Sequence, residues 1–341
     1  MTKIAINGFG RIGRLFFRQM ANQKDAQVVA INDLGNVENL AYLLKYDTVY
    51  GRFKSSIVAK GNSLLVDGRT VQVLQEKDPA ILPWKKLGID IVVEATGVFE
   101  SYEEAKMHLR AGAKRVVITA PAKDQESKEG KTVLMGVNDN AMSACKITSN
   151  GSCTTNSVAQ IAQVLNEKIG IAKALLNTTH GYTATQSLVD GPTKGRDMRR
   201  GRAAGQNIVP SSTGAAISVT RAVTDLVGKF DGIALRVPIV AGSIADLTFL
   251  AKRKTTAGEV NDILTKAAKS SRFKDVLAVS DEPLVSSDII GQPYGAIVDL
   301  EMTRVVDGDL VKVLSWYDNE GGYVATLVRH VVAAARSLKL E

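Results

Sequence analysis

The feature that most constrains the fold is the glycine-rich segment GFGRIG at residues 8–13. A short β-rich run, Lys3–Asn7, precedes this segment, and a helical pattern of apolar residues follows it as far as Met20. A strand, the pattern G-x-G-x-x-G and a helix, in this order, are typical of a dinucleotide-binding βαβ unit. Gly8 and Gly10 allow a tight turn and close approach to a pyrophosphate, and Gly13 lets the helix pack closely on the strand.

An acidic residue, Asp33, stands just after the next apolar run, Val28–Ile31. It follows the last glycine of the motif by about twenty residues, the spacing of a carboxylate that accepts a hydrogen bond from a ribose 2′-hydroxyl. A carboxylate at this place repels the 2′-phosphate of NADP. We therefore predict NAD as the cofactor.

Further apolar runs in the first half predict parallel strands at residues 89–94, 115–118 and 133–135, with a helix at 102–111 between the first two. Alternation of strands and helices is typical of a doubly wound sheet. Ligands of such sheets bind beyond the carboxyl ends of the strands. Thr96 and Thr119 follow two predicted strands, so we expect them to face the cofactor.

The second half has a different pattern, with long β-rich runs at residues 233–237, 245–251, 297–303 and 310–317. Asp307-Gly308 between the last two runs predicts a hairpin, and helices are expected at 257–269 and 324–338. The sequence thus predicts an α/β protein with two domains. An N-terminal doubly wound (Rossmann) NAD-binding domain takes residues 1–151, joined by a C-terminal helix at 319–341. An α+β catalytic domain with a mainly antiparallel sheet takes residues 152–318.

Cys153 lies in the segment SCTTN at residues 152–156, directly before apolar residues that recur at helical spacing from Val158 onward. The pattern predicts that a helix begins at Cys153. Unpaired N–H groups and the positive end of a helix dipole favour a thiolate over a thiol, which suits a nucleophile. The alternative is a cysteine that serves only as a small buried hydrophobe.

Composition narrows the protein classes. The two cysteines, Cys145 and Cys153, cannot form a disulfide framework, and the three histidines are far apart, so we expect no metal site. No apolar run approaches the roughly 18 residues of a membrane span, so we expect no membrane partner and a cytoplasmic location. The net charge is +8, and basic residues concentrate only at Lys194, Arg196, Arg199, Arg200 and Arg202. Such a stretch attracts small phosphorylated ligands as readily as nucleic acid, or is simply a solvated loop.

Several segments together resemble the family of phosphorylating glyceraldehyde-3-phosphate dehydrogenases. They include SCTTN at 152–156, NGFGRIGR at 7–14, LLKYDT at 43–48, EATG at 94–97, TTHGYT at 178–183, the run 199–214, RVP at 236–238 and WYDNE at 316–320. The resemblance implies NAD-dependent oxidation and phosphorylation of D-glyceraldehyde 3-phosphate to 1,3-bisphosphoglycerate, through a thioester on a cysteine. It also implies a homotetramer, in which the loop 182–207 lines the neighbouring subunit's cofactor pocket.

The resemblance assigns roles to individual residues. Cys153 matches the nucleophile, and His180 matches the histidine that forms an ion pair with its thiolate and later moves the proton. Thr183 and Arg236 match the site for the substrate phosphate. The attacking phosphate is matched by Ser152, Thr154, Thr213 and Gly214, with Arg200 close enough to serve. The cofactor matches are Gly8, Gly10, Arg11, Ile12, Gly13, Asp33, Lys77, Thr96, Thr119, Asn319 and Tyr323.

Three alternatives remain open on the sequence. An erythrose-4-phosphate dehydrogenase of the same superfamily would hydrolyse its acyl-enzyme, although the complete second set of phosphate residues argues against it. A dehydrogenase that uses Tyr102 and Lys106 has the required spacing, but these residues fit a solvated helix face better. An NAD-responsive RNA-binding protein would use the basic stretch at 196–202, yet no dedicated nucleic-acid motif accompanies it, so only weak, salt-dependent association is expected.

Overall fold

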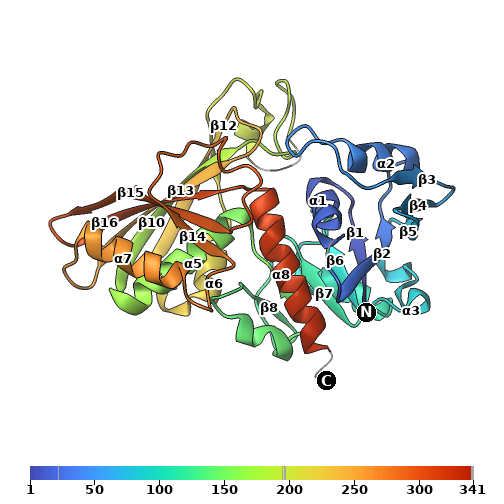
Figure 1. Cartoon of the computed structure of the whole chain (residues 1–341), viewed down its shortest axis with the longest axis horizontal. Helices are drawn as coiled ribbons and strands as arrows, with labels where there is room; N and C mark the ends of the chain where they lie inside the picture. The colour runs from blue at the N-terminus through green and yellow to red at the C-terminus, as the bar shows by residue number, and fades with distance from the viewer. Residues whose placement is uncertain (22, 194, 196, 339–341) are drawn as a thin grey trace. The chain divides into compact units, whose positions relative to one another are not determined.

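A computed structural model describes residues 1–21, 23–193, 195 and 197–338. The chain forms two compact units (Figure 1). The first contains residues 1–133, 139–151 and 327–341, and the second contains 134–138 and 152–326. The boundary near the C-terminus falls inside the last helix, α8 (Gly321–Ser337).

The first unit is built on a sheet whose strands run in the order β3-β4-β5-β2-β1-β6-β7-β9-β8. From β5 to β8 every neighbouring pair is parallel, while β3 and β4 extend the edge beyond β5 in antiparallel pairing. The strands are β1 (Thr2–Asn7), β2 (Ala26–Asn32), β3 (Ile57–Ala59), β4 (Ser63–Val66), β5 (Arg69–Leu74), β6 (Ile91–Glu94), β7 (Arg115–Ile118), β8 (Gly130–Thr132) and β9 (Ile147–Ser149). The helices are α1 (Arg11–Met20), α2 (Val37–Lys45), α3 (Trp84–Leu87) and α4 (Tyr102–Arg110), with 3-10 turns η1 (Pro79–Ile81) and η2 (Asp139–Ala144).

The central strands β6 and β7 are buried along their whole length, as parallel strands covered on both faces are. The doubly wound sheet predicted for the first half is therefore confirmed. The register of β1 places Asn7 opposite Asn32 of β2 and Glu94 of β6. The carboxyl ends of three neighbouring strands thus meet at one edge of the sheet, where a ligand is expected to bind.

The strand predicted at residues 133–135 is wrong. The strand lies three residues earlier, at β8, and it pairs with β9, which was not predicted. Val133 and Leu134 are fully buried but lie beyond the end of β8. A short apolar run indicates that its residues are buried, but burial alone does not determine which residues pair with a neighbouring strand. The antiparallel extension by β3 and β4 was not predicted either.

The second unit contains a mixed sheet in the order β11-β12-β10-β13-β16-β15-β14. Its strands are β10 (Ile171–Gly181), β11 (Val209–Ser212), β12 (Phe230–Val237), β13 (Ser243–Ala251), β14 (Leu277–Ser280), β15 (Ala296–Val306) and β16 (Leu310–Tyr317). The pairs β10–β12 and β14–β15 are parallel and the other neighbouring pairs are antiparallel, so the sheet is mainly antiparallel, as predicted. The predicted hairpin is confirmed, because Asp307 and Gly308 join β15 to β16 with φ angles of 48° and 75°.

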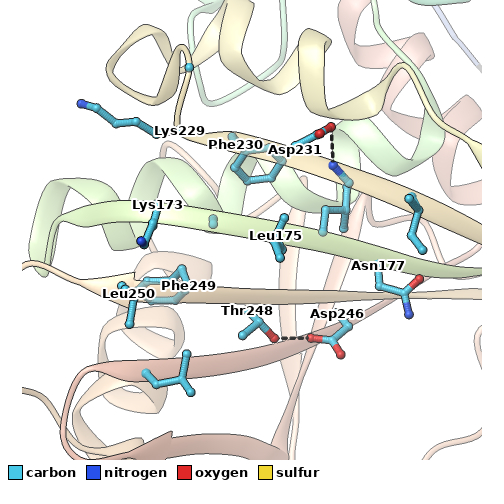
Figure 2. Close-up of a pocket in the computed structure, with 16 residues that line it drawn as sticks. Lys173, Leu175, Asn177, Lys229, Phe230, Asp231, Asp246, Thr248, Phe249 and Leu250 are labelled. Carbon is cyan, nitrogen blue, oxygen red and sulfur yellow. Dashed lines mark hydrogen bonds between the residues drawn. The ribbon is translucent and has the colours of Figure 1, made fainter.

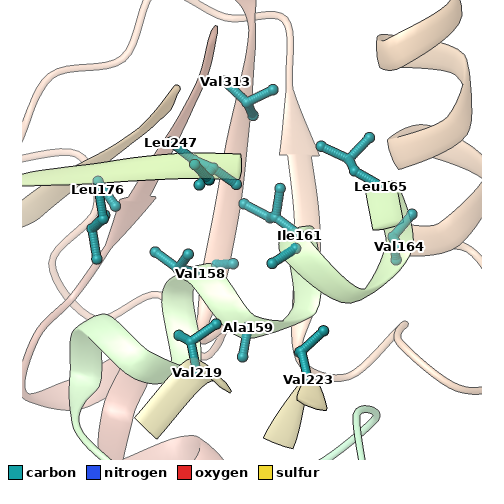
Figure 3. Packing of buried hydrophobic residues seen from close by; sticks show 14 of the residues in the cluster. Val158, Ala159, Ile161, Val164, Leu165, Leu176, Val219, Val223, Leu247 and Val313 are labelled. Atoms are coloured by element: carbon teal, nitrogen blue, oxygen red, sulfur yellow. The ribbon is translucent and has the colours of Figure 1, made fainter. Parts of the chain in front are cut away.

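The helices α5 (Cys153–Lys168), α6 (Ala215–Ala222) and α7 (Ala257–Ala268) complete the second unit, with 3-10 turns η3 (Met198–Gly201) and η4 (Thr224–Leu226). Figure 3 shows Val158 and Ile161 of α5 packed among side chains from the sheet, including Leu247 and Val313. This apolar contact fixes α5 against the sheet and so fixes the position of its first residue. Among the described residues, no helix combines the length and the apolar character that a membrane crossing requires.

Candidate active site

Helix α5 begins at Cys153, as the sequence predicted. Ser152 caps the helix by accepting a hydrogen bond from the Thr155 backbone N–H, and the Ser152 N–H donates to the Thr155 hydroxyl. This reciprocal capping box holds the first turn in one conformation. Cys153 is half-buried, so its sulfur sits beside the N–H groups of Cys153 and Thr154 at the helix start without being sealed in the core.

His180 lies near the end of the long strand β10, where the parallel register places it opposite Arg236 of β12. The structure brings it to Cys153, with 3.3 Å between His180 Nε2 and Cys153 Sγ. His180 is buried, and its ring packs edge-on against Tyr317. Two residues 27 positions apart therefore meet within hydrogen-bonding distance, as the family resemblance implied.

Two neighbours of Nδ1 bear on which ring nitrogen of His180 holds the proton. The Gly181 carbonyl oxygen lies 2.6 Å from His180 Nδ1, and a carbonyl oxygen can only accept. Arg236 Nη1 can only donate and lies near the same nitrogen, so the two neighbours make opposite demands on Nδ1. We assign the proton of the neutral ring to Nδ1, where it serves the shorter contact, with the carbonyl, and leaves the lone pair of Nε2 facing the sulfur. Arg236 Nη1 donates to the same carbonyl at 3.2 Å and lies 2.8 Å from Nδ1.

The surroundings of this pair oppose the ion pair that the family resemblance implied. Burial raises the pKa of the Cys153 thiol, and the Arg236 guanidinium and the N–H groups of the first turn lower it by less. Burial and the same guanidinium lower the pKa of His180 to about 3. An imidazolium next to the half-buried guanidinium of Arg236 is disfavoured by like charge. These pKa shifts favour a neutral thiol beside a neutral imidazole over the expected ion pair.

A second group of predicted residues forms a polar cluster on the neighbouring loop. Arg200 donates from Nη2 to the Ser211 hydroxyl at 2.7 Å and from Nη1 to the Thr185 hydroxyl at 3.0 Å. The Thr185 hydroxyl lies 2.9 Å from that of Thr183. Arg200 also lowers the pKa of His180 through its charge. Thr183 and Arg200 are thus linked through Thr185, which was not among the predicted site residues.

Other residues predicted to bind phosphate have hydroxyls engaged within the protein. The Thr154 hydroxyl is buried and lies 2.8 Å from the Tyr317 hydroxyl, which also contacts Thr178. Thr213 accepts a hydrogen bond from the Ala215 N–H, where Gly214 precedes helix α6. Tyr317 was not predicted as part of this site, because nothing in its local sequence indicates that it faces the cysteine.

The remaining residues of the basic stretch do not converge on the cysteine. Arg202 pairs with Asp190, and Arg199 lies 3.7 Å from Asp197. The side chains of both arginines are exposed. Lys194 and Arg196 lie outside the described residues.

The first unit has a cavity of about 800 Å³ at the carboxyl edge of its sheet. Five of the predicted cofactor residues line it, namely Gly8, Gly10, Asp33, Lys77 and Thr96. The cavity lies within the size range of small-molecule sites. Its apolar walls come from residues that the motif did not identify, including Leu34, Pro79, Val98, Phe99 and Met107.

The glycines of the motif fit a dinucleotide. Gly8 has a φ of +93°, and a Cβ on Gly13 would lie 2.2 Å from the Gly8 carbonyl oxygen, so both positions exclude a side chain. A Cβ on Gly10 would meet no atom within 4 Å, which leaves the start of α1 open for a pyrophosphate. Asp33 accepts hydrogen bonds from the N–H groups of Phe9 and Gly35, so its carboxylate is held beside the turn.

The other predicted cofactor residues lie elsewhere. The Arg11 guanidinium pairs with Asp47 at 2.7 Å, and Ile12 lies in the first turn of α1. Thr119 follows β7 and donates its N–H to the Glu94 carbonyl. Asn319 and Tyr323 belong to the second unit, where Asn319 accepts hydrogen bonds from the Gly242 N–H and the Ser243 hydroxyl.

A parallel sheet with a ligand cavity at the carboxyl ends of its strands, together with the glycine motif and an acidic residue, defines a dinucleotide-binding protein. Comparison with known proteins agrees. Residues 2–102 match the NAD binding domain of glyceraldehyde 3-phosphate dehydrogenase, and residues 152–319 match its C-terminal domain. The chain belongs to the glyceraldehyde-3-phosphate dehydrogenase family, and its cofactor is NAD.

Relatives at high coverage support this assignment. A glyceraldehyde-3-phosphate dehydrogenase of Thermotoga maritima is 50% identical over 326 residues, which cover 95% of this chain and 96% of that protein. Glyceraldehyde-3-phosphate dehydrogenase 2 of Bacillus subtilis is 47% identical over 337 residues, 97% of each chain. The Streptomyces coelicolor enzyme is 45% identical over 339 residues, 98% of this chain and 99% of its own.

Proposed function

We propose that the protein oxidises D-glyceraldehyde 3-phosphate to 1,3-bisphosphoglycerate with NAD and inorganic phosphate, using Cys153 as the nucleophile. The contact of 3.3 Å between Cys153 Sγ and His180 Nε2 carries this proposal. A thiol next to a base is the arrangement needed for covalent catalysis on an aldehyde. Family membership supports the substrate, because the relatives carry the name of that aldehyde.

His180 acts first as a general base in this proposal. With its proton on Nδ1, the free lone pair of Nε2 takes the thiol proton of Cys153 as the sulfur attacks the aldehyde carbon. The new alkoxide is then stabilised by N–H groups at the start of α5 and by the protonated imidazole. Arg236 disfavours the imidazolium, so His180 readily gives this proton back to the Cys153 sulfur when the carbon–sulfur bond later breaks.

NAD held by the residues of the first unit's cavity would supply the hydride acceptor, and Cys153 would then carry the acyl group as a thioester. Inorganic phosphate then attacks the thioester carbon, the carbon–sulfur bond breaks, and the acyl phosphate leaves the regenerated cysteine. Arg200 and Arg236 supply positive charge for the two phosphate groups, with hydroxyls and backbone N–H groups of Ser152, Thr154, Thr183 and Thr213 as further donors. The proposal treats residues 1–151 with the C-terminal helix as the cofactor domain and 152–318 as the catalytic domain.

Initial rates test this proposal. NADH formation from glyceraldehyde 3-phosphate is measured with NAD or NADP, each with and without inorganic phosphate. We expect turnover that requires phosphate and prefers NAD. Turnover that continues unchanged without phosphate would instead indicate hydrolysis of the acyl-enzyme, as in an erythrose-4-phosphate dehydrogenase.

We also propose that the enzyme is a homotetramer, with one face of the second unit's sheet in a subunit interface. This face has a hollow of about 1120 Å³, lined by residues of β10, β12 and β13 (Figure 2). Leu175 and Ile233 on it are 66% and 55% exposed. Lys173, Lys229 and Asp231 line the same hollow, so a two-fold arrangement of two copies can place charges of opposite sign across it.

Sedimentation velocity of the full chain tests the assembly. We expect a tetramer for the wild type and smaller species for Leu175→Asp, because a charge would be buried in an apolar contact. Lys252→Asp, on an exposed residue that does not line the hollow, serves as the control. A wild-type monomer at micromolar concentration would contradict the assembly without affecting the catalytic proposal.

A further inference from the structure

Polar side chains at the ends of the central strands form a hydrogen-bonded chain along the wall of the cofactor cavity, and Asn7, Asn32 and Glu76 themselves line it. Its members stand one or two residues before Gly8, Asp33, Lys77 and Thr96, all of which line the cavity. Hydrogen bonds join these members, which are Asn7, Asn32, Glu76 and Glu94. None of the proposed catalytic steps uses this chain, so its purpose has to be found in its geometry.

One end of the chain is fixed by the backbone of Glu76. Its N–H donates to Asn32 Oδ1, and its carbonyl accepts from Asn32 Nδ2, both at 2.8 Å, so the Asn32 amide has only one satisfactory orientation. Asn32 Nδ2 also donates to Asn7 Oδ1 at 2.7 Å. The Asn7 amide is therefore oriented too, and its Nδ2 donates to Glu94 Oε2 at 2.6 Å.

The other end is fixed by Trp84. An indole N–H can only donate, and Trp84 Nε1 lies 3.0 Å from His108 Nδ1, which must accept. The proton of the neutral His108 ring is therefore on Nε2, which donates to Glu94 Oε2 at 3.0 Å. Trp84 and His108 are fully buried, so neither has water as a substitute partner.

Glu94 lies where the two ends meet. Its Oε2 accepts from Asn7 and His108, and its Oε1 accepts from the N–H and the hydroxyl of Thr96. Asn7 and His108 are donors whose orientation is set elsewhere, so only a group that accepts at both oxygens satisfies the site. A buried charge usually stabilises a fold less than apolar packing of the same volume does. The contribution of Glu94 is therefore to hold the side chains that donate to it in one arrangement.

We infer that Glu94, held by His108 and Trp84, is a positioning residue for NAD binding: it fixes Asn7 and Thr96, and through Asn32 the turns that carry Gly8, Asp33 and Lys77. The inference rests on the proposed function only in placing NAD in this cavity. A prearranged site loses less conformational freedom when it binds its ligand. Disturbing Glu94 should thus weaken NAD binding while leaving the chemistry at Cys153 intact.

The decisive variant is Glu94→Gln. The amide keeps the shape of the carboxylate but turns one acceptor into a donor that faces other donors. We expect the Kd of NAD, measured by calorimetry on the full chain, to rise roughly tenfold to a hundredfold, the loss expected for a hydrogen bond to a charged group. The kcat at saturating NAD and the KM for phosphate should stay within about twofold. Glu103→Gln, on the exposed face of α4, is the matched control and should leave the Kd unchanged.

A second set of variants tests the direction of the hydrogen bonds that join these side chains. In the double variant Asn7→Asp/Glu94→Gln, the carboxylate introduced at position 7 accepts from both Asn32 and the amide introduced at position 94, so this branch is restored. The double variant should bind NAD more tightly than Glu94→Gln, whereas Asn7→Asp alone places two carboxylates together and should bind it more weakly than the wild type. A residue that only supports the fold would show no such rescue of binding.

Trp84→Phe is the milder variant, which keeps a ring in the core but removes the N–H that fixes His108. It should raise the Kd of NAD by a smaller factor, and it tests the inference if Glu94→Gln does not fold. Folded variants that bind NAD as the wild type does, with only a lowered melting temperature, would overturn the inference. A wild-type protein that fails to bind NAD would instead overturn the proposed function.

Discussion

The carboxyl edge of the first unit's sheet, called here the cofactor edge, and the site around Cys153 satisfy their buried polar groups in opposite ways. At the cofactor edge, donors from Asn7, His108 and Thr96 converge on one acceptor, Glu94. At the cysteine site, Arg236 places a second donor beside a nitrogen that already donates to Gly181, and its own Nε is buried with no hydrogen-bond partner among the described residues. The first site is therefore complete by itself, while the second keeps a buried donor that the phosphate of the proposed substrate would satisfy.

The largest expected effect comes from removing the nucleophile. Cys153→Ser should lower kcat for aldehyde oxidation by at least about a thousandfold, because a serine hydroxyl is not ionised near neutral pH. The Kd of NAD should not change, since the cofactor edge is complete without the cysteine. Steady-state rates and calorimetry check the two parts, and Cys145→Ser, at a buried cysteine of the first unit, is the control. Retention of more than a few per cent of the activity would contradict the covalent route.

The next largest effect is the pH dependence of thiol reactivity at the incomplete site. Only the thiolate reacts with iodoacetamide, and burial raises the pKa of Cys153. The alkylation rate of the protein without substrates should therefore rise about tenfold per pH unit, roughly a hundredfold between pH 7 and pH 9. Mass spectrometry of Cys145→Ser protein follows the reaction. A rate that is already constant between pH 6 and pH 8 would show that the thiolate and imidazolium form after all, against these pKa directions.

The smallest effect concerns the choice of cofactor. Asp33→Ala removes the carboxylate that would repel a 2′-phosphate, and the kcat/KM ratio of NAD to NADP should fall by about tenfold. The loss of the acceptor for the Phe9 and Gly35 N–H groups should also weaken NAD binding slightly. Glu38→Ala, an exposed carboxylate on α2, is the control. If the ratio stays constant, discrimination lies outside this turn.

Sequence patterns predicted the structure best where the residue types of a short segment require one particular backbone conformation. The glycine motif, the start of α5 at Cys153 and the hairpin at Asp307-Gly308 each combine a residue type with a backbone requirement, and each is confirmed. The strand that carries His180 was not predicted, because polar residues from Asn177 to Thr179 interrupt the apolar alternation of β10. The apolar run at 133–135 was wrongly predicted to be a strand for the opposite reason. Its residues Val133 and Leu134 are apolar and buried, but the run joins no strand.

The contacts that matter chemically were less predictable than the elements. His180 was assigned by resemblance, and its partnership with Gly181 and Arg236 depends on a strand register that no local pattern reveals. The chain from Trp84 to Glu76 joins distant segments, so a sequence shows its polar residues but not their pairing. Which nitrogen of a buried histidine holds the proton follows from its neighbours in space.

The parallel pairing of β10 with β12 has a further consequence for how this protein tolerates length changes. Successive residues of a strand face opposite sides, so one inserted or deleted residue before His180 would turn the imidazole away from the sulfur and break its alignment with Arg236. Natural or engineered indels should therefore be found in the connecting loops, such as the one between β15 and β16, and should be absent from these two strands.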